Sequence, residues 1–241
     1  MKTVLLFLLL SFPCLATFSY VSGSAAQSSN VTSATTLPIN TSGANLLVIE
    51  VSTFGSSFTL MDSLTGCASP CNTLLLTGQT VGGGGSILLS IYYVLNPTVG
   101  ANHVFSVSGI FPSLVVHAFS GALAFGGMGY SRFEYNSATS TTSLSAGTNV
   151  IPTVNNCLVI TALVTDSVIS SQAAPGFTVP YSNAGAGSLA IGGSMGYMIQ
   201  TTATPETPIW TWTTSADAGV VSFFFTPSAG PTVGAKRRIL Y

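Results

Sequence analysis

The stretch "NCLVITALV", residues 156–164, is almost entirely apolar and rich in β-branched side chains. Three further runs have the same character: "ANLLVIEV" at 44–51, "ILLSIYYVL" at 87–95 and "GVVSFFF" at 219–225. Each run has the length of a strand and is far shorter than the roughly 18 residues that a membrane-spanning helix needs. The runs therefore predict buried strands and no membrane span.

Strand signals continue through the rest of the chain, and no stretch repeats apolar residues at helical spacing. Short β-branched and aromatic segments bounded by Gly, Pro, Asn and Ser predict strands near 31–39, 44–53, 57–61, 73–78, 86–95, 103–108, 113–119, 156–165, 187–199, 207–213 and 218–226, with one or two more in 129–153. About eleven strands in roughly 200 residues predict one all-β domain, a two-sheet antiparallel sandwich that is jelly-roll-like in size. The alternative is an outer-membrane barrel, whose lumen is usually rich in charged side chains. This chain has few charges to place there.

Charged residues make up only 5% of the 241 residues, against about 25% in a typical soluble domain. Ser, Thr, Asn and Gly must therefore supply most of the polar surface. Beyond Lys2, the basic residues are Arg132 and a terminal group of three, Lys236, Arg237 and Arg238. The body of the chain carries no basic patch, which argues against nucleic-acid binding.

The N-terminus has the pattern of a secretory signal peptide. Lys2 precedes an apolar segment at 4–10, and small residues then give two candidate cleavage sites, after Ala26 and, as the alternative, after Ala16. We expect a secreted or extracellular protein that can associate with a surface. The expected division is a signal peptide at 1–26, a β-sandwich domain at 27–228, and a Gly/Pro linker with a basic tail at 229–241.

The segment "DSLTGCASPCNTLLL", residues 62–76, places Cys67 and Cys71 four apart around a Ser-Pro turn. A zinc site needs about four ligands, and a thioredoxin-like centre needs C-x-x-C in a βαβ unit; the segment offers neither. In an oxidising compartment we expect the pair to form a disulfide, which stabilises so small a loop by about 2 kcal/mol. Cys157 is then expected to be a buried small side chain, with intermolecular pairing as the alternative.

No constellation of catalytic residues stands out. Ser194 in "GGSMG" matches G-x-S-x-G, but that motif needs a strand-to-helix turn and a later histidine, and both histidines, His103 and His117, precede it. The six acids form no recognisable pair, and Asp62 and Asp217 lie in turn sequences where contacts with local backbone are expected. His117 is expected to pack inside a strand. We expect no catalytic residue, no metal site and no cofactor.

Two aromatic clusters are candidate ligand-binding surfaces. Trp210 and Trp212 in "PIWTWTT" are two apart, so on a strand they share a face. If that face is inward they belong to the core; if it is outward they form a platform that stacks on sugar rings. Tyr130 and Tyr135 in "YSRFEYN" belong either to a half-buried strand or to the rim of a binding surface.

The end of the chain, "GAKRRILY", places Lys236, Arg237 and Arg238 directly before an apolar "ILY". One interpretation is a solvated end that frays. The other is a docking tail, because adjacent cations are attracted to an anionic surface or to the acidic body of a second copy.

Several segments together resemble a group of secreted bacterial and phage-associated β-sandwich domains. The similarity covers roughly residues 40–226 and is carried by "ANLLVIEVS", "LMDSLTG", "IYYVLNPTVGANHVFSVSG", "SLVVHAFSGA" and "WTWTTSADAGVVSFFF". Ala118 stands where that group often has an acid, and the cysteine pair is inserted in a turn. The resemblance implies a β-sandwich that acts as an extracellular or virion-surface module.

The function that these patterns favour is a non-catalytic extracellular or particle-surface module with a structural or interaction role. The first alternative is a carbohydrate-binding module that uses exposed aromatic side chains, and the second is a secreted hydrolase. The expected partners are a glycan or a protein surface. Self-association is also expected, because a net charge of −1 gives little repulsion between copies.

Overall fold

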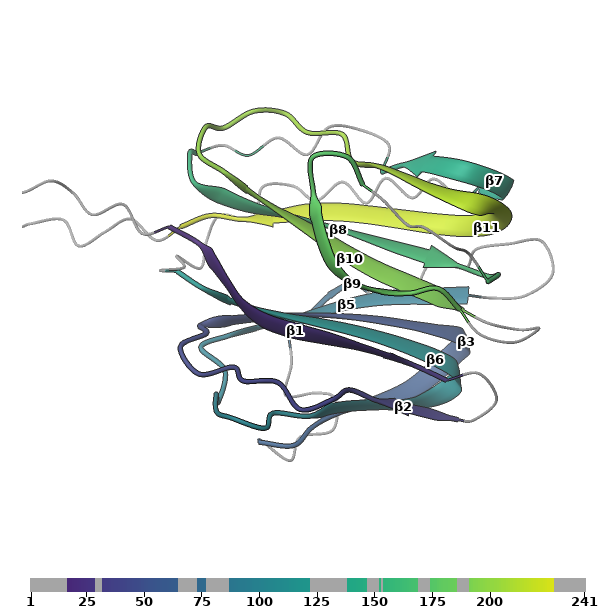
Figure 1. The fold of residues 1–241 in the computed structure, drawn as a ribbon, viewed down its shortest axis with the longest axis horizontal. Helices are drawn as coiled ribbons and strands as arrows, with labels where there is room; N and C mark the ends of the chain where they lie inside the picture. Colours follow the sequence, from purple (N-terminus) through teal and green to yellow (C-terminus); the bar gives the residue numbers. More distant parts are fainter. Residues whose placement is uncertain are drawn as a thin grey trace, which may run out of the picture.

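The computed structural model describes residues 17–28, 32–64, 73–76, 87–121, 138–146, 152, 154–168, 174–185 and 191–227. Within these ranges the chain forms eleven strands and no helix. The strands make two antiparallel sheets that lie face to face as two layers (Figure 1). The predicted all-β, two-sheet sandwich is therefore confirmed.

The first sheet has the strand order β1-β6-β3-β5-β4, and the short strand β2 also pairs with β6. Its long central strands β3 and β6 pair along most of their length. The bounds are β1 (Ser19–Gln27), β2 (Ser33–Thr35), β3 (Leu46–Asp62), β4 (Thr73–Leu76), β5 (Ile87–Leu95) and β6 (Phe105–Ser120).

The second sheet has the strand order β7-β11-β8-β10-β9. Its central strand, β8, contains the "CLVITALV" run, and all of its residues are buried. The bounds are β7 (Ala138–Ser145), β8 (Cys157–Thr165), β9 (Thr178–Asn183), β10 (Gly192–Gln200) and β11 (Ile209–Phe225).

The main core lies between the sheets, because one buried cluster contains Leu46 and Val48 of β3 together with Leu158 and Ile160 of β8. The alternating residues of β3 form a second buried cluster on the outer face of the first sheet, beneath β2 and the segment that follows it. A third cluster, which includes Leu163 of β8, covers the outer face of the second sheet. Strands buried on both faces read as continuous apolar runs, which explains why these runs decide the fold.

Three pairs of expected strands are single long strands. The turns expected near residues 54–56, 109–112 and 214–217 are irregularities within β3, β6 and β11. Gly55 and Phe111 have φ angles of +80° and +50° at two of these points. A bulge uses the same small residues and unusual backbone angles as a turn, yet lets the strand continue.

Two strands were not expected from the sequence. β1 falls inside the predicted signal peptide, and it pairs with β6 from Ser19 opposite Ser120 to Gln27 opposite Ser113. β9 is a short edge strand, and its mostly half-buried or exposed sequence "TVPYSN" gives little strand signal. By contrast, the strand expected at 31–39 is shorter in the structure, where it consists of β2 alone. Ile39 adds an isolated bridge to His103.

Candidate functional site

Trp210 and Trp212 share a face of β11, as predicted, and that face is buried. Their exposed fractions are 0% and 5%, in the cluster on the outer side of the second sheet. The indole Nε1 of Trp210 donates a hydrogen bond of 2.9 Å to the hydroxyl of Thr161. A platform for sugar rings needs both rings in solvent, so the outward alternative is wrong for this pair and the core alternative is right.

The other predicted site residues lie outside the described ranges, so their roles stay predictions: Tyr130, Tyr135, Cys67, Cys71, Lys236, Arg237 and Arg238. Cys157 is buried, as predicted, and it is the free cysteine of the described residues. Burial raises the pKa of its thiol, which keeps it protonated and unreactive.

Ser194 lies in the middle of β10, and the strand continues to Gln200, so the G-x-S-x-G match does not sit on a strand-to-helix turn. Asp62 accepts a hydrogen bond of 2.8 Å from the backbone N–H of Leu64, which is the local contact that its turn sequence predicted. Asp217 differs from its prediction, because it lies within β11 rather than in a turn. Its backbone N–H donates to the carboxylate of Asp166.

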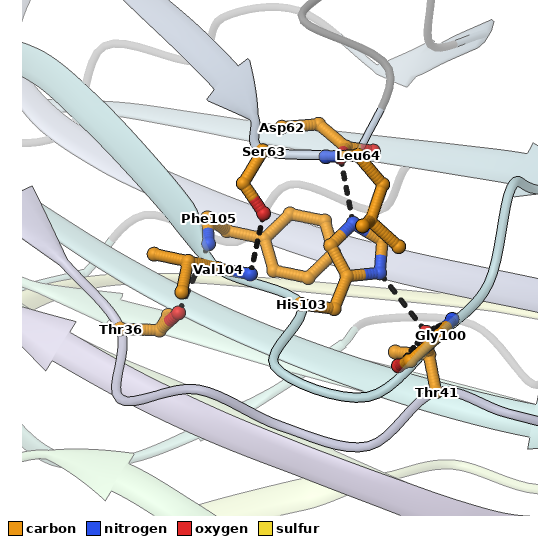
Figure 2. Close-up of polar contacts among 9 residues, drawn as sticks. All are labelled: Thr36, Thr41, Asp62, Ser63, Leu64, Gly100, His103, Val104 and Phe105. Atoms are coloured by element: carbon orange, nitrogen blue, oxygen red, sulfur yellow. Dashed lines mark hydrogen bonds and ion pairs between the residues drawn. The ribbon is translucent and has the colours of Figure 1, made fainter.

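A buried chain of polar contacts joins Asp62, His103 and Thr41 (Figure 2). His103 Nε2 lies 2.6 Å from Asp62 Oδ1, and His103 Nδ1 lies 3.0 Å from the hydroxyl of Thr41. The imidazole also stacks on Phe105, with ring centroids 4.2 Å apart. The three polar residues are almost completely buried.

Carboxylate, imidazole and hydroxyl follow one another here as in a hydrolytic triad. The hydroxyl of Thr41, however, is buried inside the protein. Thr41 is fully buried, and its Oγ1 accepts a hydrogen bond of 3.1 Å from the backbone N–H of Gly100. A nucleophile must reach a substrate, and this hydroxyl is enclosed by its own chain. The contacts instead fasten the segment before β3 to the end of β3 and the start of β6.

A second polar group lies between the sheets, and we call Glu50, Ser52, Ser113 and Asn183 the inter-sheet polar cluster. Glu50 is fully buried on the same face of β3 as Leu46 and Val48. Desolvation raises the pKa of its carboxyl to about 8, although a hydrogen bond donated by Ser52 acts in the opposite direction. Its Oε2 has no hydrogen-bond partner among the described residues.

Asn183 connects the two sheets within this cluster. Its Nδ2 lies 2.8 Å from Ser113 Oγ, 2.9 Å from the carbonyl oxygen of Ala26 and 3.2 Å from that of Leu114. These contacts reach from β9 of the second sheet to β1 and β6 of the first. The amide is therefore a polar link across one side of the sandwich, beside an otherwise apolar core.

Gly193 makes room for the cluster. It is the cross-strand partner of Asn183 in the second sheet. A Cβ on Gly193 would lie 2.6 Å from Ser113 Oγ and 2.9 Å from both carboxyl oxygens of Glu50. The Ser113 hydroxyl and the Glu50 carboxyl therefore both border the position of the missing Cβ, and the Asn183 amide contacts the same hydroxyl.

An aromatic cluster lies nearby along the same inner face and contains Tyr20, His117, Phe119, Tyr181 and Tyr197. Tyr20 and Tyr197 stack with centroids 5.1 Å apart and an interplanar angle of 6°. His117 is fully buried, neither ring nitrogen has a hydrogen-bond partner among the described residues, and desolvation lowers its pKa to about 3. His117 is thus a neutral packed side chain, which confirms its predicted place inside a strand.

The sequence signal for Glu50 and His117 is a single ionisable residue within an apolar strand run. The signal for their surroundings is much weaker, because Ser113 and Asn183 are 70 residues apart in the chain. Within the described ranges, no group of three or more His, Cys, Asp and Glu side chains is placed to hold a metal ion. These ranges also contain no helix that is long and apolar enough to cross a membrane.

Comparisons with protein-family models, with curated proteins and with solved structures find no match for this chain.

Proposed function

We propose that this chain is a non-catalytic extracellular or particle-surface module with a structural or interaction role. The observation that carries the proposal is that three chemically capable side chains of the described residues, Glu50, His103 and His117, are all 0% exposed. An enzyme that acts on an external substrate must bring such groups to a cleft. In this sandwich they lie in the interior, where they bond to or pack against the chain itself.

The polar contacts support a role in holding a shape. Asp62, His103 and Thr41 fasten an outer segment to the first sheet, and Asn183 joins one sheet to the other. Buried hydrogen-bonded polar groups specify one arrangement of a core.

A carbohydrate-binding role is the second candidate, and one observation favours it. Tyr181 is 39% exposed, it is the most exposed aromatic side chain of the described residues, and its ring lies 6.3 Å from that of His117. Half-buried Tyr197 and Tyr20 belong to the same cluster. An aromatic side chain with one face in solvent is the kind of surface on which sugar rings stack.

A glycan array tests both candidates. The protein from residue 17 onwards is applied to immobilised glycans, beside a Tyr181→Ala variant, and both bound protein and glycan chain length are recorded. Binding that the variant loses supports the carbohydrate-binding candidate, and no binding leaves the structural role as the better proposal. Shortened glycans would contradict both candidates and would instead support the alternative of a secreted hydrolase.

Self-association belongs to the same proposal and follows from the net charge of −1. Light scattering at high concentration near pH 6 should detect species larger than a monomer. A strict monomer under these conditions would contradict it.

A further inference from the structure

The carboxyl of Glu50 is buried in the core without a cationic partner among the described residues. It shares the inner face of β3 with Leu46 and Val48; its Oε1 accepts a hydrogen bond from the hydroxyl of Ser52, and its Oε2 has no hydrogen-bond partner among the described residues. Burying an ionisable group in such surroundings is unfavourable, and an apolar residue of similar size is usually as stable or more stable there. Buried acids with raised pKa values are typical of sites where a proton is transferred.

Two groups that can react with each other lie beside this acid. Ser113 carries a hydroxyl on β6 of the first sheet, and Asn183 carries a carboxamide on β9 of the second. Their Oγ and Nδ2 atoms are 2.8 Å apart, and both residues are buried. Because Cγ is bonded directly to Nδ2, the carboxamide carbon is one covalent bond away from the atom that contacts the hydroxyl oxygen.

We propose that Ser113 and Asn183 form an intramolecular ester that cross-links the two sheets, with Glu50 transferring the proton. In its ionised form Glu50 takes the hydroxyl proton as Ser113 Oγ bonds to Asn183 Cγ. The protonated Glu50 then gives this proton to Nδ2 as the Cγ–Nδ2 bond breaks. One ester forms, one ammonia leaves, and Glu50 is regenerated, so the reaction needs no other reactant.

Three features of the site favour the reaction. The folded chain holds hydroxyl and carboxamide together, and such proximity can replace the entropy of a bimolecular encounter. The carboxyl has a pKa of about 8, close enough to neutrality for it both to accept and to donate the proton. The site is buried, so water is excluded and the product ester is protected from hydrolysis.

Gly193 supplies the remaining requirement, which is space. The position of its missing Cβ lies within 3 Å of both Ser113 Oγ and the Glu50 carboxyl. Gly193 is also opposite Asn183 on the neighbouring strand, and the Asn183 carboxamide contacts the same Ser113 hydroxyl. A larger residue would separate them.

Intact-protein mass spectrometry tests the proposal directly. Freshly purified protein from residue 17 onwards should be lighter than its sequence mass by one ammonia. Digestion with a protease of broad specificity should yield a branched peptide that contains both Ser113 and Asn183. Hydroxylamine at alkaline pH cleaves esters, so it should split the branched peptide into its Ser113 and Asn183 peptides and leave a hydroxamate on residue 183.

Variants define the roles of the two side chains. Ser113→Ala and Glu50→Gln should both have the full sequence mass, with circular dichroism confirming that the β-sandwich forms. Ser194→Ala is the matched control, because that buried hydroxyl lies on the other face of β10, and it should keep the loss of ammonia.

Full mass in the wild-type protein would overturn the proposal whether or not any variant folds. Loss of ammonia from a peptide that contains Asn183 but not Ser113 would indicate a cyclic imide and would overturn it as well. A cross-link that persists in Glu50→Gln would overturn the role of Glu50.

Discussion

Gly193 of the second sheet faces Glu50 and Ser113 of the first sheet. A substitution at Gly193 therefore tests how closely the two sheets approach each other at this point. Substitution Gly193→Ala places a Cβ 2.6 Å from Ser113 Oγ and 2.9 Å from the Glu50 carboxyl. Overpacking of this kind destabilises a core by about 1–3 kcal/mol, so we expect a loss of that size in urea unfolding. Gly100→Ala is the control, because its Cβ would meet only Leu64 Cδ1 at 3.5 Å. Equal stability of the two variants would contradict the close approach.

Thr41 offers a second test at the level of one side chain. Thr41→Val keeps the shape but removes the hydroxyl that contacts His103 Nδ1 and accepts from the Gly100 N–H. A buried polar group left without its partner costs about 1–3 kcal/mol, and we expect a loss of stability of this size by thermal unfolding. Thr98→Val, at an exposed position, should change little. A neutral Thr41→Val variant would show that the polar chain in Figure 2 does not stabilise the fold.

The sequence indicated some of these residues but not their partners. Glu50 and His117 are conspicuous as single ionisable residues in the runs "ANLLVIEV" and "SLVVHAFSG". Glu50 lies close to Gly193, and His103 contacts Asp62, although the members of each pair are far apart in the chain. Such pairs follow from strand order and register, which local patterns do not encode.

At the scale of one element, β1 distinguishes the two predicted cleavage sites. Cleavage after Ala16 leaves β1 intact, whereas cleavage after Ala26 removes all of it except Gln27. β1 supplies backbone partners for the whole second half of β6, and Phe18 just before it is part of the core. Loss of a full edge strand leaves β6 with an unpaired edge, which favours aggregation.

We therefore expect the protein that starts at residue 17 to be soluble and to unfold cooperatively, and the protein that starts at residue 27 to aggregate or to lose much of its stability. Size-exclusion chromatography and thermal unfolding of the two proteins, expressed in parallel, measure the difference. N-terminal sequencing of secreted protein should find Thr17. Equal stability of the two proteins, or a natural N-terminus at Gln27, would contradict the importance of β1.

Strands were predicted well where both faces are buried and poorly where they lie at an edge. β5 and β8 were located within a residue or two, because continuous apolar runs leave few alternatives. β9 has one proline and several exposed positions, so its sequence is close to that of a loop. β1 was missed for another reason, since small and apolar residues near an N-terminus also match a cleavage region.

For the whole molecule, the pKa shifts of two fully buried side chains, Glu50 and His117, predict how stability depends on pH. Burial raises the pKa of Glu50 from 4.5 to about 8 and lowers that of His117 from 6.5 to about 3. The folded state therefore favours neutral Glu50, whose contribution is lost as the pH rises from 4.5 to 8. It also favours neutral His117, whose contribution is lost as the pH falls from 6.5 to 3.

The two effects oppose each other between pH 4.5 and 6.5, because a rise in pH there reduces the stabilisation from neutral Glu50 and increases that from neutral His117. We expect a plateau in that range, with stability falling on both sides: toward pH 8 because of Glu50, and toward pH 3 because of His117. Tyr20, Tyr93, Tyr197 and Cys157 have raised pKa values and titrate above this window. The Glu50→Gln and His117→Phe variants test whether each limb of the curve comes from one residue.

Urea unfolding from pH 3 to 8 measures this curve. Glu50→Gln should remove the decline above pH 6.5 and leave the decline below 4.5, and His117→Phe should do the reverse. The assignment does not depend on the proposed ester, because Glu50 is regenerated in that reaction and remains a buried acid. A wild-type protein whose stability is constant from pH 6.5 to 8 would show that Glu50 does not hold its proton in the core. A decline that survives in Glu50→Gln would show that another group causes it.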